Sequence, residues 1–368
     1  MTEPVRHVVL IADRIVTPDQ AGTIRAFVER LGHRGLAARI LCSAWKAPSR
    51  GGLDVEESAG LARPLWLSWG LRSLRRPEGT SRPALLHALQ ARMAPAALEL
   101  AERWQIPYIQ GVEEFLPPGS RLRLSQRWCR GLVATSRELG EDLTRGFGVP
   151  GDRVHVIHRG LEVAESVTSR WATGPSPVSV IGAAGPLVHA SGFTTFLNAA
   201  RRVLDAGVDA EFVLVGEGEE EGDLRRRADR LRLAERLTFA GEAAVGMSFW
   251  NVLDVYCQPS TTPTVGRDLA RAMAHGIPPV ASDIEGLRSL VTHGVTGLRV
   301  PPSDTNALAR AMLDLLADRP RAARLGLDAR EAVLRDYDLD READLLSKVY
   351  RGIIDSERPA ETVTLSMT

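Results

Sequence analysis

The sequence has no long apolar run, and cysteine is scarce. No stretch of about 18 or more apolar residues occurs, so the sequence predicts no membrane-spanning helix. The first residues lack a basic segment followed by an apolar run, and we expect no signal peptide. The cysteines, Cys42, Cys129 and Cys257, are scattered without metal-ligand spacing. They are typical of buried thiols in a reducing compartment, and we expect a cytoplasmic protein with no bound metal or cofactor.

Lysine is nearly absent. Of the 46 Lys+Arg residues, only Lys46 and Lys348 are lysines, which we interpret as genome composition. The formal net charge is zero, but residues 1–163 carry an excess of basic residues and the remainder an equal excess of acidic ones. The basic half could face anionic lipid, a phosphorylated acceptor or an acidic partner, or it could be an uneven solvated surface. We expect no nucleic-acid partner.

Short apolar runs alternate with helical periodicity along the chain, which predicts parallel α/β architecture. The Ser-, Thr-, Pro- and Gly-rich stretch 164–177 breaks this rhythm and predicts a linker. We therefore expect a first domain over 1–163, a second over 178–337, a helix at 338–355 and a frayed tail at 356–368. The predicted strands are His7–Asp13, 37–42, 106–110, 131–135, 153–158, 178–183, 211–216, 236–240, 254–258, 279–282 and 297–300. The predicted helices include 20–33, 91–104, 304–317 and 338–354.

Six short pieces follow one another over about 120 residues of the second half, in an order far more specific than a single glycine motif. They are Gly185-Pro186-Leu187, Ser191-Gly192-Phe193, Leu214-Val215-Gly216-Glu217-Gly218, Pro259-Ser260, Arg271-Ala272-Met273-Ala274-His275-Gly276-Ile277-Pro278 and His293-Gly294-Val295-Thr296-Gly297-Leu298. In this order they resemble the second half of family-4 (group 1) glycosyltransferases. Looser matches in the first half are Leu31-Gly32-His33-Arg34-Gly35, Val133-Ala134-Thr135-Ser136 and Val156–Glu162.

The resemblance implies a GT-B fold, in which two Rossmann-like α/β domains face a central cleft. It also implies transfer of a sugar from a nucleotide-sugar donor, whose diphosphate leaving group must be neutralised by placed cations and helix N-termini. In the family, an Arg and a Lys meet that demand, two Glu residues bind donor hydroxyls, and a His lies near the reacting centre.

Each of those family positions holds a different residue here. Pro186 replaces the Arg, Ser191 the Lys, Pro263 the first Glu, Arg271 the second Glu and Glu113 the His. A proline side chain has neither donor nor acceptor, and serine carries no charge. The catalytic residues therefore stay unassigned.

Two arginines in the helix expected after Gly266 could compensate for the missing positive charge. Arg267 and Arg271 are spaced i, i+4, which places them on one helix face, where they could bind a diphosphate. The alternative for Arg271 is a surface ion pair with Asp268 or Glu285. Ala21-Gly22-Thr23 is either a backbone approach to a ligand or a simple turn. The residues that we expect around the donor are Gly22, Gly185, Glu217, Ser260, Thr264, Gly266, Arg267 and Arg271.

Two functions remain open from the sequence. The first is a degenerate glycosyltransferase, either non-catalytic or partner-dependent, that binds a nucleotide sugar, a glycan or an active glycosyltransferase. The second is an active enzyme whose altered donor site uses Arg267 and Arg271. A nicotinamide dehydrogenase is excluded, because no Gly-x-Gly-x-x-Gly fingerprint follows the first strand.

The segment 61–76 combines Trp and Leu with Arg, a pattern typical of an interfacial membrane contact. Trp66, Trp69, Arg72, Arg75 and Arg76 would hold the protein peripherally at the inner membrane face. The alternative is that the Trp and Leu side chains face the core. Co-sedimentation with anionic but not neutral vesicles would support the membrane contact, and equal behaviour on both would count against it.

Overall fold

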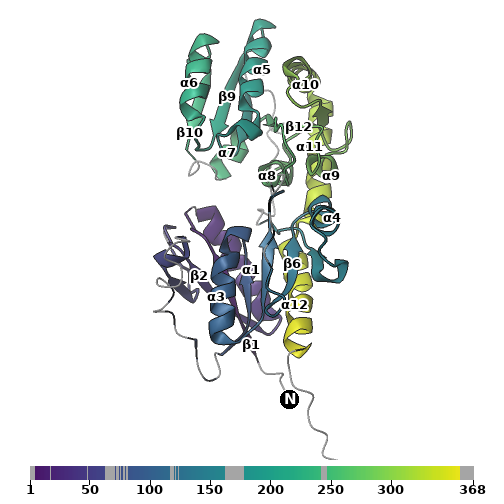
Figure 1. The fold of residues 1–368 in the computed structure, drawn as a ribbon. Helices are drawn as coiled ribbons and strands as arrows, with labels where there is room; N and C mark the ends of the chain where they lie inside the picture. The colour runs from purple at the N-terminus through teal and green to yellow at the C-terminus, as the bar shows by residue number, and fades with distance from the viewer. Residues whose placement is uncertain are drawn as a thin grey trace, which may run out of the picture. The chain divides into compact units, whose positions relative to one another are not determined.

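A computed structural model describes residues 5–16, 18–47, 49–62, 71, 74, 76–77, 79, 82–116, 120, 122, 124–161, 178–241 and 247–356. The chain forms two compact units (Figure 1). Unit 1 comprises Met1–Gly160 and Leu339–Thr368, and unit 2 comprises Leu161–Asp338. The predicted linker, 164–177, lies outside the described residues.

Unit 1 contains a parallel sheet whose described strands have the order β3-β2-β1-β4-β5-β6-β7. The strands are β1 (Arg6–Ala12), β2 (Leu36–Cys42), β3 (Val55–Glu57), β4 (Pro83–Ala88), β5 (Tyr108–Val112), β6 (Cys129–Ala134) and β7 (Val154–Val156). Among its helices are α1 (Pro18–His33), α3 (Ala94–Trp104), α4 (Arg137–Arg145) and α12 (Leu339–Ser356). The order reverses between β1 and β4, and ligands of open parallel sheets bind beyond the strand ends at such a switch point.

Helix α12 packs on the same face of this sheet as α1, so the C-terminal helix belongs to unit 1 (Figure 1). Its buried side chains, including Leu346, Tyr350 and Ile354, join the core around Val8 and Leu10 of β1. Ion pairs from α1 and from the residue after it border that core, with Arg30 3.1 Å and Arg34 3.0 Å from Asp340 of α12. The apolar stripe of α12 thus provides the stability, because exposed ion pairs contribute little.

Unit 2 contains a second parallel sheet, with the order β10-β9-β8-β11-β12-β13 among the described strands. The strands are β8 (Ser179–Ala184), β9 (Ala210–Val215), β10 (Leu237–Ala240), β11 (Val255–Gln258), β12 (Pro279–Ser282) and β13 (Leu298–Val300). The helices are α5 (Phe193–Asp205), α6 (Glu221–Arg230), α7 (Met247–Val252), α8 (Arg267–Ala274), α9 (Leu287–Leu290), α10 (Thr305–Ala317) and α11 (Arg319–Asp336). The switch point lies between β8 and β11.

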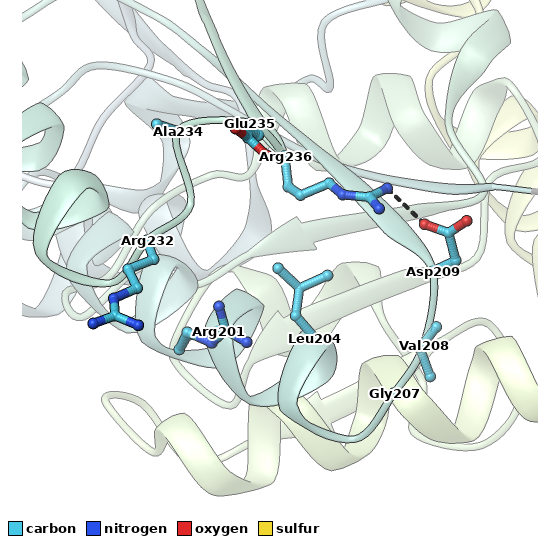
Figure 2. A pocket seen from close by; sticks show the side chains of 9 residues that line it. All are labelled: Arg201, Leu204, Gly207, Val208, Asp209, Arg232, Ala234, Glu235 and Arg236. Carbon is cyan, nitrogen blue, oxygen red and sulfur yellow. Dashed lines mark hydrogen bonds and ion pairs between the residues drawn. The ribbon is translucent and has the colours of Figure 1, made fainter.

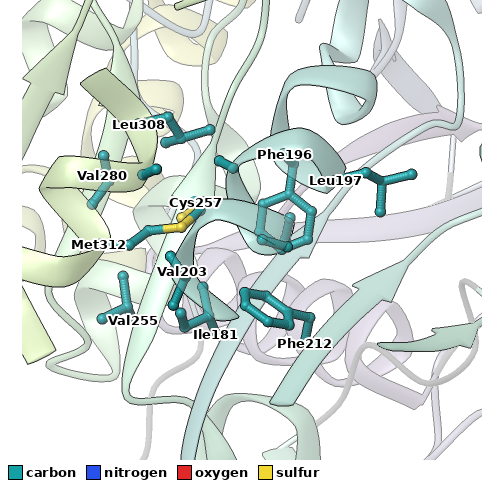
Figure 3. Close-up of a cluster of buried hydrophobic side chains, with 14 of the residues drawn as sticks. Ile181, Phe196, Leu197, Val203, Phe212, Val255, Cys257, Val280, Leu308 and Met312 are labelled. Carbon is teal, nitrogen blue, oxygen red and sulfur yellow. The ribbon is translucent and has the colours of Figure 1, made fainter. Parts of the chain in front are cut away.

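Helices cover both faces of the unit 2 sheet. Helices α5, α6 and α10 bury one face, where Phe196 and Phe212 meet edge-on with ring centroids 6.0 Å apart (Figure 3). Helices α7, α8 and α9 cover the other face, around Tyr256 and Leu269. Burial on both faces explains why the central strands β8, β11 and β12 are mostly apolar without regular polar alternation. The predicted parallel α/β class is confirmed in both units.

Two local predictions are wrong. The sequence pattern misses the three-residue β3 and also β4, a central strand of unit 1, because Pro83–Ala88 contains no β-branched residue and begins with proline. The simple turn offered for Ala21-Gly22-Thr23 is the second, because Gly22 lies within α1, which begins at Pro18 and contains the predicted helix 20–33. Proline is well tolerated in a first helical turn, which moves the helix start ahead of the predicted residue 20.

No helix in the described part of the chain is both long enough and apolar enough to span a bilayer.

Candidate functional site

The residues predicted around a donor in the second half gather at the carboxyl edge of the unit 2 sheet. Strands β9, β8 and β11 are neighbours, so the loops that follow them meet at this edge. Glu217 lies in the loop after β9, Gly185 after β8, and Ser260 and Thr264 after β11. This edge contains the unit 2 switch point, where ligands of such sheets bind. Gly22 lies in unit 1, so the structure does not place it with this group.

Close backbone packing shapes the loop that joins β8 to α5. A Cβ at Gly216 would overlap the carbonyl oxygen of Gly185, and one at Gly192 would overlap that of Pro259. Gly192 also has a φ of 71°, in the left-handed region that favours glycine. These glycines are therefore required by the approach of three neighbouring loops.

The two residues predicted to replace the family's cations, Pro186 and Ser191, bond to each other. The Ser191 hydroxyl donates to the Pro186 carbonyl oxygen at 2.6 Å. Ser191 is buried and Pro186 is exposed. The loop is also tied to the β11 loop, since the Thr261 N–H donates to the Ala190 carbonyl oxygen at 2.8 Å. The side chains of Pro186 and Ser191 thus present no charge at this edge.

A buried polar chain extends from the end of β11 into the following loop. The Tyr256 hydroxyl lies 2.8 Å from Gln258 Oε1, and Gln258 Nε2 donates to Ser260 Oγ at 3.1 Å. Burial raises the pKa of Tyr256 well above its usual value, and the nearby Asp268 carboxylate adds to this effect. Tyr256 is therefore a neutral hydrogen-bonding group, and the predicted candidate Ser260 is part of this chain.

Helix α8 begins at the same edge, after Gly266, which adopts a left-handed conformation with φ 66°. Arg267 is exposed in the first turn, and no ion pair joins it to another described residue. The Arg271 side chain is only 14% exposed, and its guanidinium lies 3.7 Å from the Asp268 carboxylate. The ion pair that the sequence offered as an alternative for Arg271 is therefore present, and the two arginines differ in accessibility.

The remaining unit 2 candidates surround the start of α8 and the end of β9. Pro263 is exposed, and the half-buried Thr264 donates its N–H to the Glu285 carbonyl oxygen at 3.4 Å. Glu217 is exposed, with its carboxylate beside Gly241. Thr264 and Glu217 keep side-chain groups that could accept or donate hydrogen bonds to a ligand.

In unit 1, the residue predicted to replace the family's His makes an ion pair. Glu113 follows β5, and its carboxylate contacts the guanidinium of Arg159, which follows β7. The two side chains are 23% and 25% exposed, respectively. The two side chains thus form a largely enclosed ion pair beyond the ends of β5 and β7.

A buried polar group lies near this ion pair. His87 Nδ1 is 2.6 Å from the Tyr350 hydroxyl, and the Gly160 N–H donates to Glu342 at 2.8 Å. Burial lowers the pKa of His87 to about 3, and the positive charge of Arg159 acts in the same direction. His87 is therefore a neutral structural group at pH 7.

The sequence reasoning missed a polar cluster at the unit 1 switch point. Asp13 follows β1, Ser43 follows β2, and Gln90 and Arg92 follow β4. Asp13 bonds to all three of the others. The polar residue at the end of the first apolar run was the only available signal, because its partners lie after strands whose order the sequence did not show.

Most of the segment predicted to touch a membrane lies outside the described residues. Trp66, Trp69, Arg72 and Arg75 are among those not described. Leu71 and Leu74 are buried. Arg76 is half-buried, and burial lowers its pKa. The membrane contact stays a prediction.

A cavity of about 680 Å³ lies at the opposite, amino edge of the unit 2 sheet (Figure 2). Leu204 and Val208 contribute apolar surface to it, while Arg236 points to Asp209 and pairs with it at 2.6 Å. It lies at the starts of β9 and β10, away from the strand ends where such sheets bind ligands. We therefore do not assign the site to this cavity.

No group of three or more His, Cys, Asp or Glu side chains in the described part of the chain is placed to hold a metal ion.

Family models match most of the chain. Residues 20–165 match Glycosyltransferase Family 4, and residues 178–318 match Glycosyl transferases group 1. Among curated proteins, the lipopolysaccharide core biosynthesis mannosyltransferase LpsB of Rhizobium meliloti is 26% identical over 198 residues, covering 52% of this chain and 56% of that protein. The phosphatidyl-myo-inositol mannosyltransferase of Mycobacterium leprae is 34% identical over 170 residues, covering 45% and 44%. The matched stretch thus spans about half the length of these relatives.

Solved structures share the fold. Anabaena HepE, crystallised with UDP and glucose, superposes with a TM-score of 0.74 at 19% identity, covering 93% of this chain and 99% of that chain. Sucrose-phosphate synthase from Thermosynechococcus elongatus gives 0.73 at 19% identity, covering 96% and 100%. At this identity the likeness establishes the fold alone. Together with the family models it shows that the chain belongs to the family-4 (group 1) glycosyltransferases and has the GT-B fold.

Proposed function

We propose that this chain is a degenerate family-4 glycosyltransferase, which binds a nucleotide sugar or a glycan and does not by itself activate a donor. The single observation that carries the proposal is the hydrogen bond from Ser191 Oγ to the Pro186 carbonyl oxygen, 2.6 Å long. It joins the two positions at which the family carries its diphosphate-binding Arg and Lys.

The chemistry of donor cleavage explains why this bond matters. A departing nucleoside diphosphate accumulates negative charge, and donors aimed at that charge supply much of the rate acceleration. Pro186 has no side-chain donor, and the one hydroxyl proton of Ser191 is directed into the loop. Neither residue can replace a guanidinium or an ammonium group. This supports the loss of donor activation.

The charge introduced at Arg271 does not restore what these two positions have lost. Its side chain is 14% exposed and lies 3.7 Å from the Asp268 carboxylate. A nucleotide phosphate would have to compete with that carboxylate for the guanidinium. In this proposal, Arg271 is a structural group of α8, and transfer, where it occurs, needs an active glycosyltransferase partner.

A second function is favoured by one observation, the exposed Arg267 at the first turn of α8. Its guanidinium has no ion pair with another described residue, and helix N-termini attract phosphate. An active enzyme with an altered donor site would use Arg267 for the diphosphate, with Arg271 behind it.

Calorimetry and donor hydrolysis with UDP-glucose, a GDP sugar and an ADP sugar separate these functions. We expect the wild-type protein to show no hydrolysis above background. Turnover by the wild type that disappears in Arg267→Ala would overturn the proposal and support the altered enzyme. Arg310→Ala, which removes an exposed arginine of α10, is the matched control.

A variant that restores a positive charge tests the same proposal through a gain in UDP affinity. Pro186 is exposed, so Pro186→Arg adds a guanidinium to the edge without filling the core. Because a hydrogen bond to a charged group is worth about 1.5–3 kcal/mol, the affinity for UDP should rise roughly tenfold to a hundredfold. An unchanged UDP affinity would show that Pro186 does not face the nucleotide and would remove the main support for the proposal.

A further inference from the structure

The cavity at the amino edge of the unit 2 sheet has no part in the proposed function. It has a volume of about 680 Å³ and lies between the end of α5 and the starts of β9 and β10 (Figure 2). Sites for small molecules have volumes of roughly 300–1,000 Å³. The cavity is therefore large enough for a small organic ligand, at the edge opposite to the donor-side loops.

The lining of this cavity combines an apolar surface with charged groups. Leu204 of α5 and Val208 after it are half-buried and pack against the unit 2 core. The charged members of the lining are three arginines and two acidic residues, an excess of one positive charge: Arg201, Arg232, Arg236, Asp209 and Glu235. This combination suits a ligand that has an apolar body and a single negative charge.

The three arginines of the lining differ in what they already bind. Arg201 donates twice to the Asp205 carboxylate, at 3.0 and 2.6 Å, and Arg236 pairs with Asp209 at 2.6 Å. Arg232 is exposed, and no ion pair or hydrogen bond joins its side chain to another described residue. A guanidinium has five N–H donors in a planar fork. Arg232 therefore keeps the most donors for an anionic ligand.

The backbone of Arg232 has a conformation that arginine rarely adopts. Its φ is 54°, in the left-handed region. Helix α6 ends here in a Schellman motif, in which the Leu233 N–H donates to the Ala228 carbonyl oxygen at 3.0 Å and the Arg232 N–H donates to that of Asp229 at 2.9 Å. Glycine is the usual residue at this position of the motif, because it has no Cβ. The chain thus has an arginine where glycine would be less strained.

The charge of the helix end does not explain this arginine. Positive side chains near a helix C-terminus are favourable, but Arg227 and Arg230 already occupy the last turn of α6. A glycine at position 232 would leave those two in place and relieve the strain. Residues in strained backbone conformations cluster at ligand-binding sites. The cavity that Arg232 lines provides a reason for its side chain.

We propose that this cavity binds a small organic monoanion, a carboxylate attached to an apolar or aromatic body. Arg232 binds the carboxylate, whose geometry matches the guanidinium fork, and Leu204 and Val208 contact the body. A phosphate monoester carries a second negative charge near neutral pH, which Asp209 and Glu235 would repel. The inference goes beyond the proposed function and does not depend on it.

Methyl NMR and calorimetry with 3-phenylpropionate test the site, with the neutral 3-phenylpropionamide as the matched ligand. We expect 3-phenylpropionate to shift the methyl resonances of Leu204 and Val208 in the full-length protein. Because hydrogen bonds between charged groups are stronger, the carboxylate should bind about tenfold more tightly than the amide. Unshifted methyl resonances, or equal affinities for the two ligands, would overturn the proposal.

Arg232→Gly separates binding from stability. The variant loses the guanidinium and the left-handed strain together. The affinity for 3-phenylpropionate should fall about tenfold. The midpoint of thermal unfolding should rise by about 2–4 °C, because glycine adopts this φ without a Cβ clash. An arginine with a purely structural role would give a lower midpoint and an unchanged affinity, and either result would overturn the proposal.

Arg202→Ala is the matched control, since it removes an exposed arginine of α5 that is outside the lining. It should leave the affinity for 3-phenylpropionate unchanged. Tighter binding of phenyl phosphate than of 3-phenylpropionate would also overturn the proposal, in favour of a phosphate site. Donor hydrolysis by the wild type would overturn the proposed function but not this site. Absence of 3-phenylpropionate binding would remove the site and leave the proposed function in place.

Discussion

The carboxyl edges of the two sheets have the same topology but are built from different groups. In unit 1, ion pairs between side chains join the strand-end loops, as in Asp13 with Arg92 and Glu113 with Arg159. In unit 2, backbone contacts join them, with glycines pressed against neighbouring carbonyl groups and Ser191 bonded to the Pro186 carbonyl oxygen. Ion pairs thus connect the loops of the unit 1 edge, and backbone packing connects those of the unit 2 edge.

This difference shows that a fold can be preserved while the chemistry at its switch points changes. The parallel strands bring loops together wherever the strand order reverses, whatever residues those loops contain. Function therefore depends on the residues placed there and not on the sheet. In this chain, Pro186 and Ser191 place no charge at the unit 2 edge, while the unit 1 edge has a buried carboxylate at its centre.

The largest expected difference between the units is their response to acid. The pKa of the buried His87 in unit 1 is lowered to about 3, below the usual value of 6.5, mainly by burial. Between these values the unfolded chain binds a proton that the folded protein does not, so the free energy of unfolding falls as pH falls. The loss should approach roughly 4 kcal/mol by pH 3.

Hydrogen exchange measured from pH 7 to pH 4 would test this response. Protection should decrease first in β4 and α12 of unit 1. His87→Gln should flatten the dependence, and His33→Gln, at an exposed position, should not. An equal loss of protection in unit 2 over the same pH range would contradict the difference between the units. The same pH dependence of protection in His87→Gln as in the wild type would contradict the role of His87.

The second difference concerns the backbone-packed edge of unit 2. Gly192→Ala should destabilise unit 2 by about 3 kcal/mol or more, since its φ is 71° and the new Cβ would overlap the Pro259 carbonyl oxygen. Gly207→Ala is a matched control, because its φ of 81° is similar but the space around it is open. This control should cost only about 1 kcal/mol. Thermal unfolding would compare the two, and equal midpoints would contradict the close packing.

The smallest expected effect is the coupling between Glu113 and Arg159. A double-mutant cycle with Glu113→Gln and Arg159→Gln should give about 1 kcal/mol, because both side chains are three-quarters enclosed. The more exposed pair Arg50 and Glu57 should give less. Urea unfolding would measure both cycles. A coupling no larger than that of the exposed pair would show that unit 1 does not depend on this ion pair.

The sequence predicted most strands to within about two residues, because each apolar run is a local pattern. It missed β4, whose composition favours no strand, and the three-residue β3. For the donor side, the sequence motifs selected residues of unit 2 that lie at one edge of its sheet. They did not show that Arg271 is enclosed beside Asp268 while Arg267 is exposed, because accessibility depends on what packs against α8.

By itself, the sequence determined the parallel α/β class of both halves and the family, and it predicted the replacement of the family's charged donor-side residues. These features follow from local periodicity and from the order of short motifs along the chain. Only the tertiary structure decided which polar groups meet. Asp13 bonds to Gln90, 77 positions away, and His87 to Tyr350, 263 positions away. Such contacts depend on strand order and on the docking of α12 against the unit 1 sheet, which are set by burial of apolar faces over the whole unit and leave no pattern in any short stretch of sequence.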